Sequence, residues 1–231
     1  MTESQTSPPA VVTLASGPAG GGNIDDFELF YARRALRRFR ERLGRQGLLD
    51  LLAEDIDKGE AFLRENARLS EGTFNCGTTV LATRGTSAGE FVAWMDKAFA
   101  DENVLLDAQP EHYVMVGQPD GAVHIVENVG PHVCSFYLGS WSDEAMAWAA
   151  DAEERLPEAE FPYKKATNLY LADGTVVGRV LIQFGDTGEG FTSSLTVYLP
   201  TSCPEAVLEH HLRHFAVEFR NWIVASAATR S

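Results

Sequence analysis

The chain has 231 residues, of which 45% are hydrophobic, and it carries a formal net charge of −14. This length and composition suffice for one well-packed core and do not require a second one. An acidic surface repels phosphate backbones and anionic lipids, so we expect neither nucleic acid nor a membrane among the partners. No apolar run approaches the roughly 20 residues of a membrane-spanning helix.

Cysteine usage and the N-terminal residues indicate a cytoplasmic protein. Cys76, Cys134 and Cys203 are far apart in the sequence and form neither a disulfide framework nor a CxxC metal motif. The first residues lack the basic segment and the apolar segment of a secretory signal peptide. We therefore expect three reduced thiols in the cytosol.

The composition divides the chain into three parts. Residues 1–24 are rich in Ser, Thr, Pro, Gly and Ala, which predicts a disordered tail. Residues 25–70 follow a helical pattern that Gly44 and Gly47 interrupt, so we expect a helical extension made of two helices. Residues 71–231 mix strand-like and helical patterns and form the main domain.

The main domain predicts an α+β fold with an antiparallel sheet. Ser87 caps an amphipathic helix over Ala88–Ala100, and an acidic, Ala-rich segment predicts a helix over Asp143–Leu156. The last helix, Pro204–Ala227, is long enough to lie across a curved sheet and enclose a small-molecule pocket. Short loops separate the strands expected over Thr78–Gly85, His112–Gly117, Ala122–Val129, His132–Gly139, Lys165–Ala172, Thr175–Gly185 and Phe191–Leu199.

The last helix places several polar side chains on one face. His214 and Glu218 are four residues apart, so they lie one turn from each other. His210 and His211 lie one turn upstream, and either could join them. Zinc prefers imidazole and carboxylate ligands, and this spacing supplies two of them without backbone strain. The alternative is a plain His–Glu helix pair, but a carboxylate on a buried aromatic face needs a partner.

Any further ligands must come from the strands. The remaining histidines are His112, His124 and His132. Glu127 interrupts the apolar segment VHIVENV, and it differs in parity from His124, so an inward Glu127 implies an outward His124. An inward carboxylate again needs a partner, whereas the alternative is an edge-strand glutamate in water.

Four short blocks resemble one known family. The segments PEHYVMV, VHIVENVG, GRVLIQFGDTGEGFTSSLTVYL and HFAVEFRNW, within residues 78–224, are similar to the diacetylphloroglucinol hydrolase and phloretin hydrolase family. The resemblance implies a START-like helix-grip fold, in which a curved antiparallel sheet wraps a long C-terminal helix. It also implies a zinc-dependent hydrolase that cleaves the carbon–carbon bond between an acyl group and a polyhydroxylated aromatic ring.

The zinc ligands that the resemblance implies are His112, Glu127, His214 and Glu218. The first two are 15 residues apart here (127 − 112), whereas the family has a considerably longer intervening segment. This departure leaves His132 and His210 as substitutes for His112.

The remaining expectations concern chemistry and partners. Glu127 and His132 are the expected acid/base groups, and His124 and His211 are further candidates. The resemblance implies tyrosine hydroxyls at the substrate; Tyr113 and Tyr198 are the expected ones, and Tyr137 and Tyr170 are also available. The substrate class is a small aromatic or polyketide molecule, and a homodimer is compatible with the sequence. Fe²⁺ and Mn²⁺ are alternatives to Zn²⁺, because imidazole and carboxylate suit all three. The alternative function is a metal-free START-like polyketide cyclase, aromatase or carrier of hydrophobic ligands.

Overall fold

The computed structural model describes residues 14, 17, 23–141 and 147–229. The chain divides into two compact units, Met1–Gly44 and Arg45–Ser231. The tail expected over residues 1–24 lies almost wholly outside the described residues.

The first unit is described from the start of helix α1 (Ile24–Ser70) onward. Asn23 and Asp26 exchange hydrogen bonds of 2.7 and 3.0 Å between backbone and side chain, which caps the first turn. Gly44 has a φ of 64° and breaks the helical geometry, as expected there. Gly47, the second expected break, is helical, since glycine tolerates that geometry at a modest cost.

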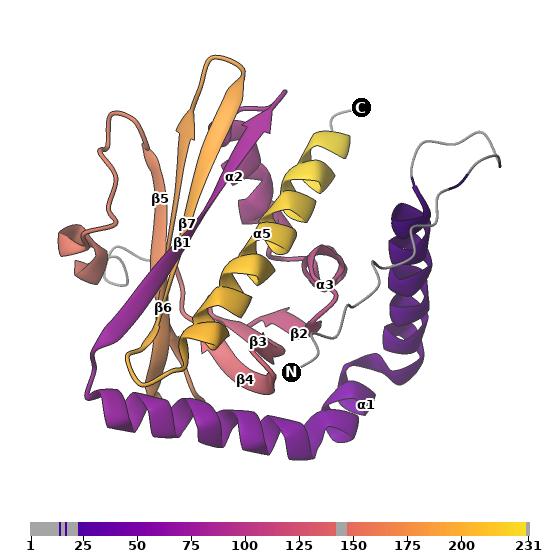
Figure 1. Ribbon diagram of the computed structural model, residues 1–231, viewed down its shortest axis with the longest axis vertical. Coiled ribbons are helices and arrows are strands. Elements are labelled where there is room, and N and C mark those ends of the chain that lie inside the picture. Colours follow the sequence, from indigo (N-terminus) through magenta and orange to yellow (C-terminus); the bar gives the residue numbers. More distant parts are fainter. Residues whose placement is uncertain (1–13, 15–16, 18–22, 142–146, 230–231) are drawn as a thin grey trace, which may run out of the picture. The chain divides into compact units, whose positions relative to one another are not determined.

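A seven-stranded antiparallel sheet forms the centre of the second unit (Figure 1). The strand order is β1-β7-β6-β5-β4-β3-β2, so the first strand in the chain lies at one edge and the second at the other. The α+β class and the antiparallel sheet are as the sequence predicts. The strands are β1 (Phe74–Arg84), β2 (His112–Gly117), β3 (Val123–Val129), β4 (His132–Leu138), β5 (Tyr163–Tyr170), β6 (Val176–Asp186) and β7 (Gly190–Pro200).

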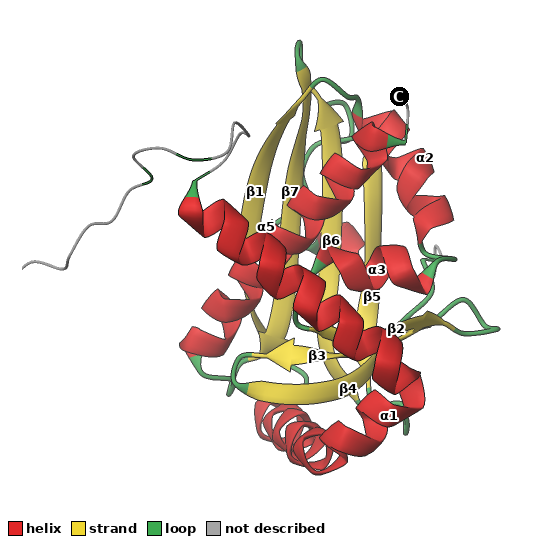
Figure 2. Cartoon of the chain, turned by 90° about the vertical axis from the view of Figure 1, so that its right-hand side faces the viewer, coloured by secondary structure: helices red, strands yellow, loops and turns green. Residues whose placement is uncertain are grey.

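One face of the sheet, here called the inner face, is covered by helices (Figures 1 and 2). The long helix α5 (Glu205–Ala228) crosses this face and contacts β1, β3 and β7. Helices α2 (Ala88–Ala98) and α3 (Glu102–Ala108) pack against α5. Ser87 and Glu90 form a capping box at the start of α2, which fixes where that helix begins.

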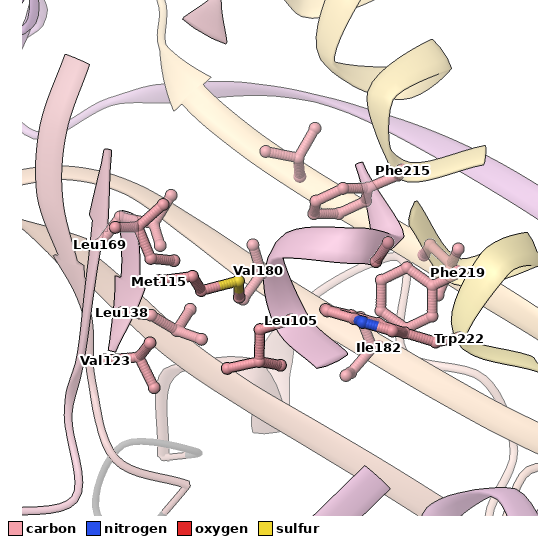
Figure 3. Close-up of a cluster of buried hydrophobic side chains, with 14 of the residues drawn as sticks. Leu105, Met115, Val123, Leu138, Leu169, Val180, Ile182, Phe215, Phe219 and Trp222 are labelled. Carbon is pink, nitrogen blue, oxygen red and sulfur yellow. The ribbon is translucent and has the colours of Figure 1, made fainter. Parts of the chain in front are cut away.

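The main hydrophobic core fills the space between α5 and the inner face (Figure 3). Phe215, Phe219 and Trp222 point from α5 toward Val180 and Ile182 of β6, and all five are buried. Each fully buried side chain of this size contributes about 1.5–3 kcal/mol to folding. The core therefore holds α5 firmly against the sheet, and this fixes the position of every polar group that α5 carries.

The prediction of a helix over Asp143–Leu156 is wrong where the structure describes this segment. Residues 143–146 lie outside the described residues, and Ala147–Asp151 is a short 3-10 helix. The backbone that follows closes only isolated turns, such as the bond from the Arg155 amide to the Ala152 carbonyl at 3.0 Å, and then binds Gln183 of β6. The Gln183 side chain accepts from the Leu156 amide at 2.8 Å and donates to the Glu154 carbonyl at 2.9 Å. This segment covers part of the other face of the sheet, here called the outer face.

Helix α3 was not expected from the sequence. It has seven residues, and Asp101 caps it by accepting a hydrogen bond of 3.0 Å from the Asn103 amide. A helix of two turns carries too few residues for a clear 3.6-residue pattern. Among the described residues, no helix is both long enough and apolar enough to cross a bilayer.

Candidate metal centre

A hairpin of β2 and β3 brings the first two polar groups of the site together. His112 lies directly opposite Glu127 in the register of the two strands. The register shifts by one residue between His112 and Val114, so Tyr113 is bulged. Both His112 and Glu127 are buried and face α5. In this hairpin, a spacing of 15 residues places His112 directly beside Glu127.

Helix α5 supplies the other two groups. His214 and Glu218 lie one turn apart on the face that packs against the sheet, and each is about 95% buried or more. Burying a carboxylate without a partner costs several kcal/mol, which is as much as the most destabilising single substitutions cost in unfolding free energy. The helix therefore carries Glu218 into the core only because polar groups of β2 and β3 meet it there.

The four side chains converge around His112. Its Nε2 atom lies 3.1 Å from His214 Nε2, 3.2 Å from Glu127 Oε2 and 3.4 Å from Glu218 Oε1, and Glu127 Oε2 lies 3.4 Å from His214 Nε2. Four ligands at 2.0–2.1 Å around a tetrahedral zinc ion stand about 3.3 Å apart. His112, Glu127 and His214 are close enough together to hold one metal ion. Glu218 approaches His112 to 3.4 Å but stands outside this group of three.

An outer hydrogen bond orients the imidazole of His112, and a carboxylate lies near that of His214. His112 Nδ1 lies 3.0 Å from the carbonyl oxygen of Leu105 in α3, so Nδ1–H donates and Nε2 keeps its lone pair toward the cluster. His214 Nδ1 lies 3.8 Å from the carboxylate of Glu111, which also lies 3.7 Å from His210 Nε2. Such outer partners fix the tautomer of a metal-binding histidine. Neither Leu105 nor Glu111 was expected from the sequence, although Glu111 adjoins His112.

Charges are strongly coupled across the site. Burial raises the pKa of Glu127, but the charges of His214 and His112 lower it by more, so it lies well below its usual range. Burial lowers the pKa of His214, but Glu127 and Glu111 raise it to about 10. Burial raises the pKa of Glu218 to about 7 against the opposing charges of the two histidines. Glu127 therefore stays ionised, whereas His214 and Glu218 hold protons that a cation can displace.

A mainly apolar cavity opens beside the cluster. Glu127, Glu218 and His211 form its polar end, and the centres of water molecules have about 50 Å³ to occupy within it. One water needs about 10–15 Å³ on this scale, so the space is close to that of one small ring. The apolar lining comes from α2, α5 and the inner face of the sheet, and includes Phe99, Met115, Phe136, Trp141, Phe215 and Phe219.

His211 is the third imidazole at the polar end. Its Nε2 atom lies 3.9 Å from Glu127 Oε1, and its ring stacks on His214. Burial lowers the pKa of His211 to about 4, so it is neutral near pH 7. Its Nδ1 atom has no hydrogen-bond partner among the described residues. A neutral imidazole in this position can take up or release a proton.

Tyr113, Tyr198 and His132, which were expected to take part in catalysis, lie away from this cavity. Tyr113 points to the outer face and donates a hydrogen bond of 2.8 Å to Asn128. Tyr198 also lies on the outer face, where its hydroxyl donates to Glu154 at 2.6 Å. Strand alternation therefore keeps both hydroxyls from a ligand in the cavity. His132 lies at the start of β4 on the same face as Phe136 and Leu138, but its ring stacks on Phe62 of α1, with ring centroids 4.0 Å apart, and it does not line the cavity.

The two other histidines are also placed outside the cluster. His124 lies on the outer face, 3.0 Å from the Ser135 hydroxyl, as the parity argument predicts for an inward Glu127. His210 lies at the rim beside Glu111 and is half-buried. His112, and not His132 or His210, is therefore the histidine that lies beside Glu127 and His214.

Comparisons with known proteins leave the site to be interpreted from its own geometry. A scan of protein-family models finds no match to the chain, and no curated protein sequence matches it.

Proposed function

We propose that this protein is a metal-dependent hydrolase of START-like helix-grip fold, which cleaves the carbon–carbon bond between an acyl group and a polyhydroxylated aromatic ring. The observation that carries the proposal is the convergence of two buried imidazoles and two buried carboxylates at the polar end of an aromatic-lined cavity. The resemblance of four sequence blocks to the diacetylphloroglucinol and phloretin hydrolases supplies the reaction class.

The donor set fits a first-row divalent cation. His112 and His214 offer nitrogen and Glu127 offers oxygen, and the spacing of these three matches the edges of a tetrahedron. Glu218, whose oxygen lies 3.4 Å from His112, is our proposed fourth ligand. When bound, such a cation supplies Lewis acidity for a carbonyl oxygen or a water molecule. Zinc is the metal that we propose, and Fe²⁺ or Mn²⁺ suit the same ligands.

The chain itself supplies orientation and proton transfer. Hydrolysis adds the hydroxyl group of water to the acyl carbon and a hydrogen to the ring carbon, so one proton must be moved. His211 faces the cavity as a neutral imidazole and is our proposed proton carrier. The apolar lining favours a flat ring and excludes bulk water. Because the space is close to that of one small ring, a substituted ring requires lining side chains such as Met115 and Phe99 to move.

The decisive experiment measures metal and cleavage together. We expect about one zinc ion per chain by elemental analysis. We also expect cleavage of 2,4-diacetylphloroglucinol or phloretin that chelation abolishes and added zinc restores. Protein without bound metal, whose cleavage is absent or indifferent to chelation, would contradict the proposal. Cleavage at an equal rate without oxygen separates a hydrolase from an iron oxygenase.

A matched pair of histidine variants locates the metal. His214→Gln removes a ligand, and we expect metal affinity to fall by about 100-fold or more, since losing even an outer partner typically costs 10–100-fold. His124→Gln changes a histidine on the outer face and is expected to leave metal content and cleavage as they are. Equal metal affinity in the two variants would place the ion elsewhere.

The second candidate is a metal-free binding protein or cyclase of the same fold. One observation favours it: His112 Nε2 and His214 Nε2 are 3.1 Å apart, a distance that also suits a hydrogen bond from a protonated His214. Ligand binding that persists unchanged in metal-free protein, together with an absence of cleavage, would favour this candidate.

A further inference from the structure

The cavity has a polar group at the end opposite the His–Glu cluster. Trp222 lies on α5 one turn beyond Glu218, about 6 Å further along the helix axis, and both side chains line the cavity. Trp222 is 3% exposed. In Figure 3 its indole extends from α5 into the apolar cluster, beside Phe219 and Ile182.

The indole N–H of Trp222 has no acceptor. Its Nε1 atom is fully buried and makes no hydrogen bond with any described residue. The nearest rings are Phe219, at 5.2 Å between ring centroids, and Phe99, at 5.7 Å. A ring face is a much weaker acceptor than an oxygen atom. A buried donor that lacks a partner is unfavourable, and the indole that carries this one borders the cavity, so an acceptor that packs against the indole would satisfy it.

Few polar groups line the rest of the cavity. Apart from Glu127, His211 and Glu218 at the polar end, the other residues that line the cavity are aliphatic, aromatic or methionine, and two of the aromatic ones, Trp141 and Trp222, carry an indole N–H. A ligand that fills the space thus meets charge and imidazole at one end and indole donors elsewhere, of which the one on Trp222 is buried without a partner among the described residues.

We propose that Trp222 selects aromatic ligands that carry an oxygen acceptor on the ring position facing away from the His–Glu cluster, by donating its indole N–H to that oxygen. The choice of a phenolic ring rests on the proposed function, because an acyl group held at the cluster directs the opposite ring position toward Trp222. A hydroxyl group there accepts the hydrogen bond, whereas a bare ring leaves the donor unpaired.

Two probe rings of nearly equal size test this in the full-length protein. Phenol carries the oxygen, and toluene lacks it. We expect phenol, and not toluene, to move the Trp222 indole proton downfield in ¹H–¹⁵N spectra of the wild-type protein. By calorimetry, Trp222→Phe should weaken phenol binding by about tenfold and leave toluene binding nearly unchanged, since one neutral hydrogen bond is removed.

Trp148→Phe is the matched control, because Trp148 has another buried indole nitrogen without a partner among the described residues, but it lies on the outer face. It should change neither affinity. The proposal is overturned if neither ring binds, if both rings shift the Trp222 proton alike, or if Trp222→Phe weakens both equally. The wild-type spectra decide the matter even where Trp222→Phe does not fold. Phenol selection without acyl-ring cleavage would overturn the proposed function alone, and cleavage without selection would overturn this inference alone.

Discussion

The two faces of the sheet each hold a carboxylate among polar neighbours, and they satisfy it in different ways. On the outer face, Glu154 accepts a hydrogen bond of 2.6 Å from the Tyr198 hydroxyl and one of 2.8 Å from the Cys76 thiol. On the inner face, Glu127 and Glu218 meet imidazole nitrogens only at 3.2–3.4 Å. The outer carboxylate has neutral donors at short hydrogen-bond distances, whereas the inner carboxylates share two imidazoles at longer distances, and one of these, His214, is kept protonated by the surrounding carboxylates.

The supply of protons explains the difference. Burial and Glu154 raise the pKa of Cys76 to about 12, and they raise that of Tyr198 further, so both donors keep their protons at any physiological pH. On the inner face, His112 Nδ1–H donates its hydrogen bond to the Leu105 carbonyl, so the Nε2 atom faces the cluster. Acceptors there outnumber protons. A surplus of converging acceptors indicates a cation site, whereas a balanced set indicates a structural network.

The sharpest test of this comparison replaces one carboxylate on each face by its amide. Glu127→Gln should lower metal affinity by about 100-fold or more and abolish cleavage, because it removes a ligand. Glu154→Gln should lower the unfolding free energy by about 1–3 kcal/mol, because the buried Tyr198 hydroxyl and the half-buried Cys76 thiol lose their charged acceptor, and should leave metal content intact. Elemental analysis and chemical denaturation measure the two effects. Equal metal loss in both variants would remove the distinction between the faces.

A smaller effect than that of the carboxylate variants is expected from pH, which changes how much a bound cation stabilises the folded protein. The raised pKa values of Glu218, from 4.5 to about 7, and of His214, from 6.5 to about 10, mean that metal-free folded protein binds extra protons in this window. His211, whose pKa is lowered from 6.5 to about 4, opposes Glu218 below about pH 6.5, so the unfolding free energy falls chiefly as pH rises from about 6.5 to 10. A cation needs these groups deprotonated, so its stabilisation grows with pH.

Melting temperatures with zinc and with chelator measure this linkage. We expect the gap between them to widen by about 5 °C or more from about pH 6 to about pH 9. A gap that stays constant or narrows would show that the cation does not displace protons from His214 and Glu218.

The smallest expected effect concerns the outer partner of His214. Glu111→Gln removes the charge that lies 3.8 Å from His214 Nδ1, and should weaken metal binding by about tenfold without abolishing cleavage. Glu209→Gln is the control, because Glu209 is exposed on α5 and pairs with Arg213. A metal titration with a competing chelator resolves the difference. Identical affinities would mean that Glu111 is only a rim charge.

Some of the site was readable from the sequence for clear physical reasons. His214 and Glu218 follow from helical periodicity, because a spacing of four residues fixes a shared face. An inward Glu127 goes together with an outward His124, because strand alternation links the two. His112 was less certain because it lies only 15 residues before Glu127, which departs from the family pattern. The bulge at Tyr113, which sets how the two residues pair, has no clear sequence signal either.

Other features could not be read because both faces of a strand are covered. Strand β7 is buried at nearly every position, since α5 covers one side and the segment around Trp148 covers the other. Its apolar pattern therefore does not reveal that Tyr198 faces outward. The Leu105 carbonyl depends on α3, a helix too short to be recognised, and a backbone oxygen leaves no residue-type signal at all.

The pairing of His112 with His214 has a mechanical consequence. These residues are 102 positions apart in the chain, and they belong to a hairpin at one edge of the sheet and to the helix that crosses it. An ion shared by the two would act as a reversible cross-link, and it would restrict the unfolded chain much as a disulfide across a long loop does. Loss of the ion would then loosen one wall of the cavity and remove the Lewis acid at the same time. Ligand binding and turnover would therefore be lost together when metal is scarce.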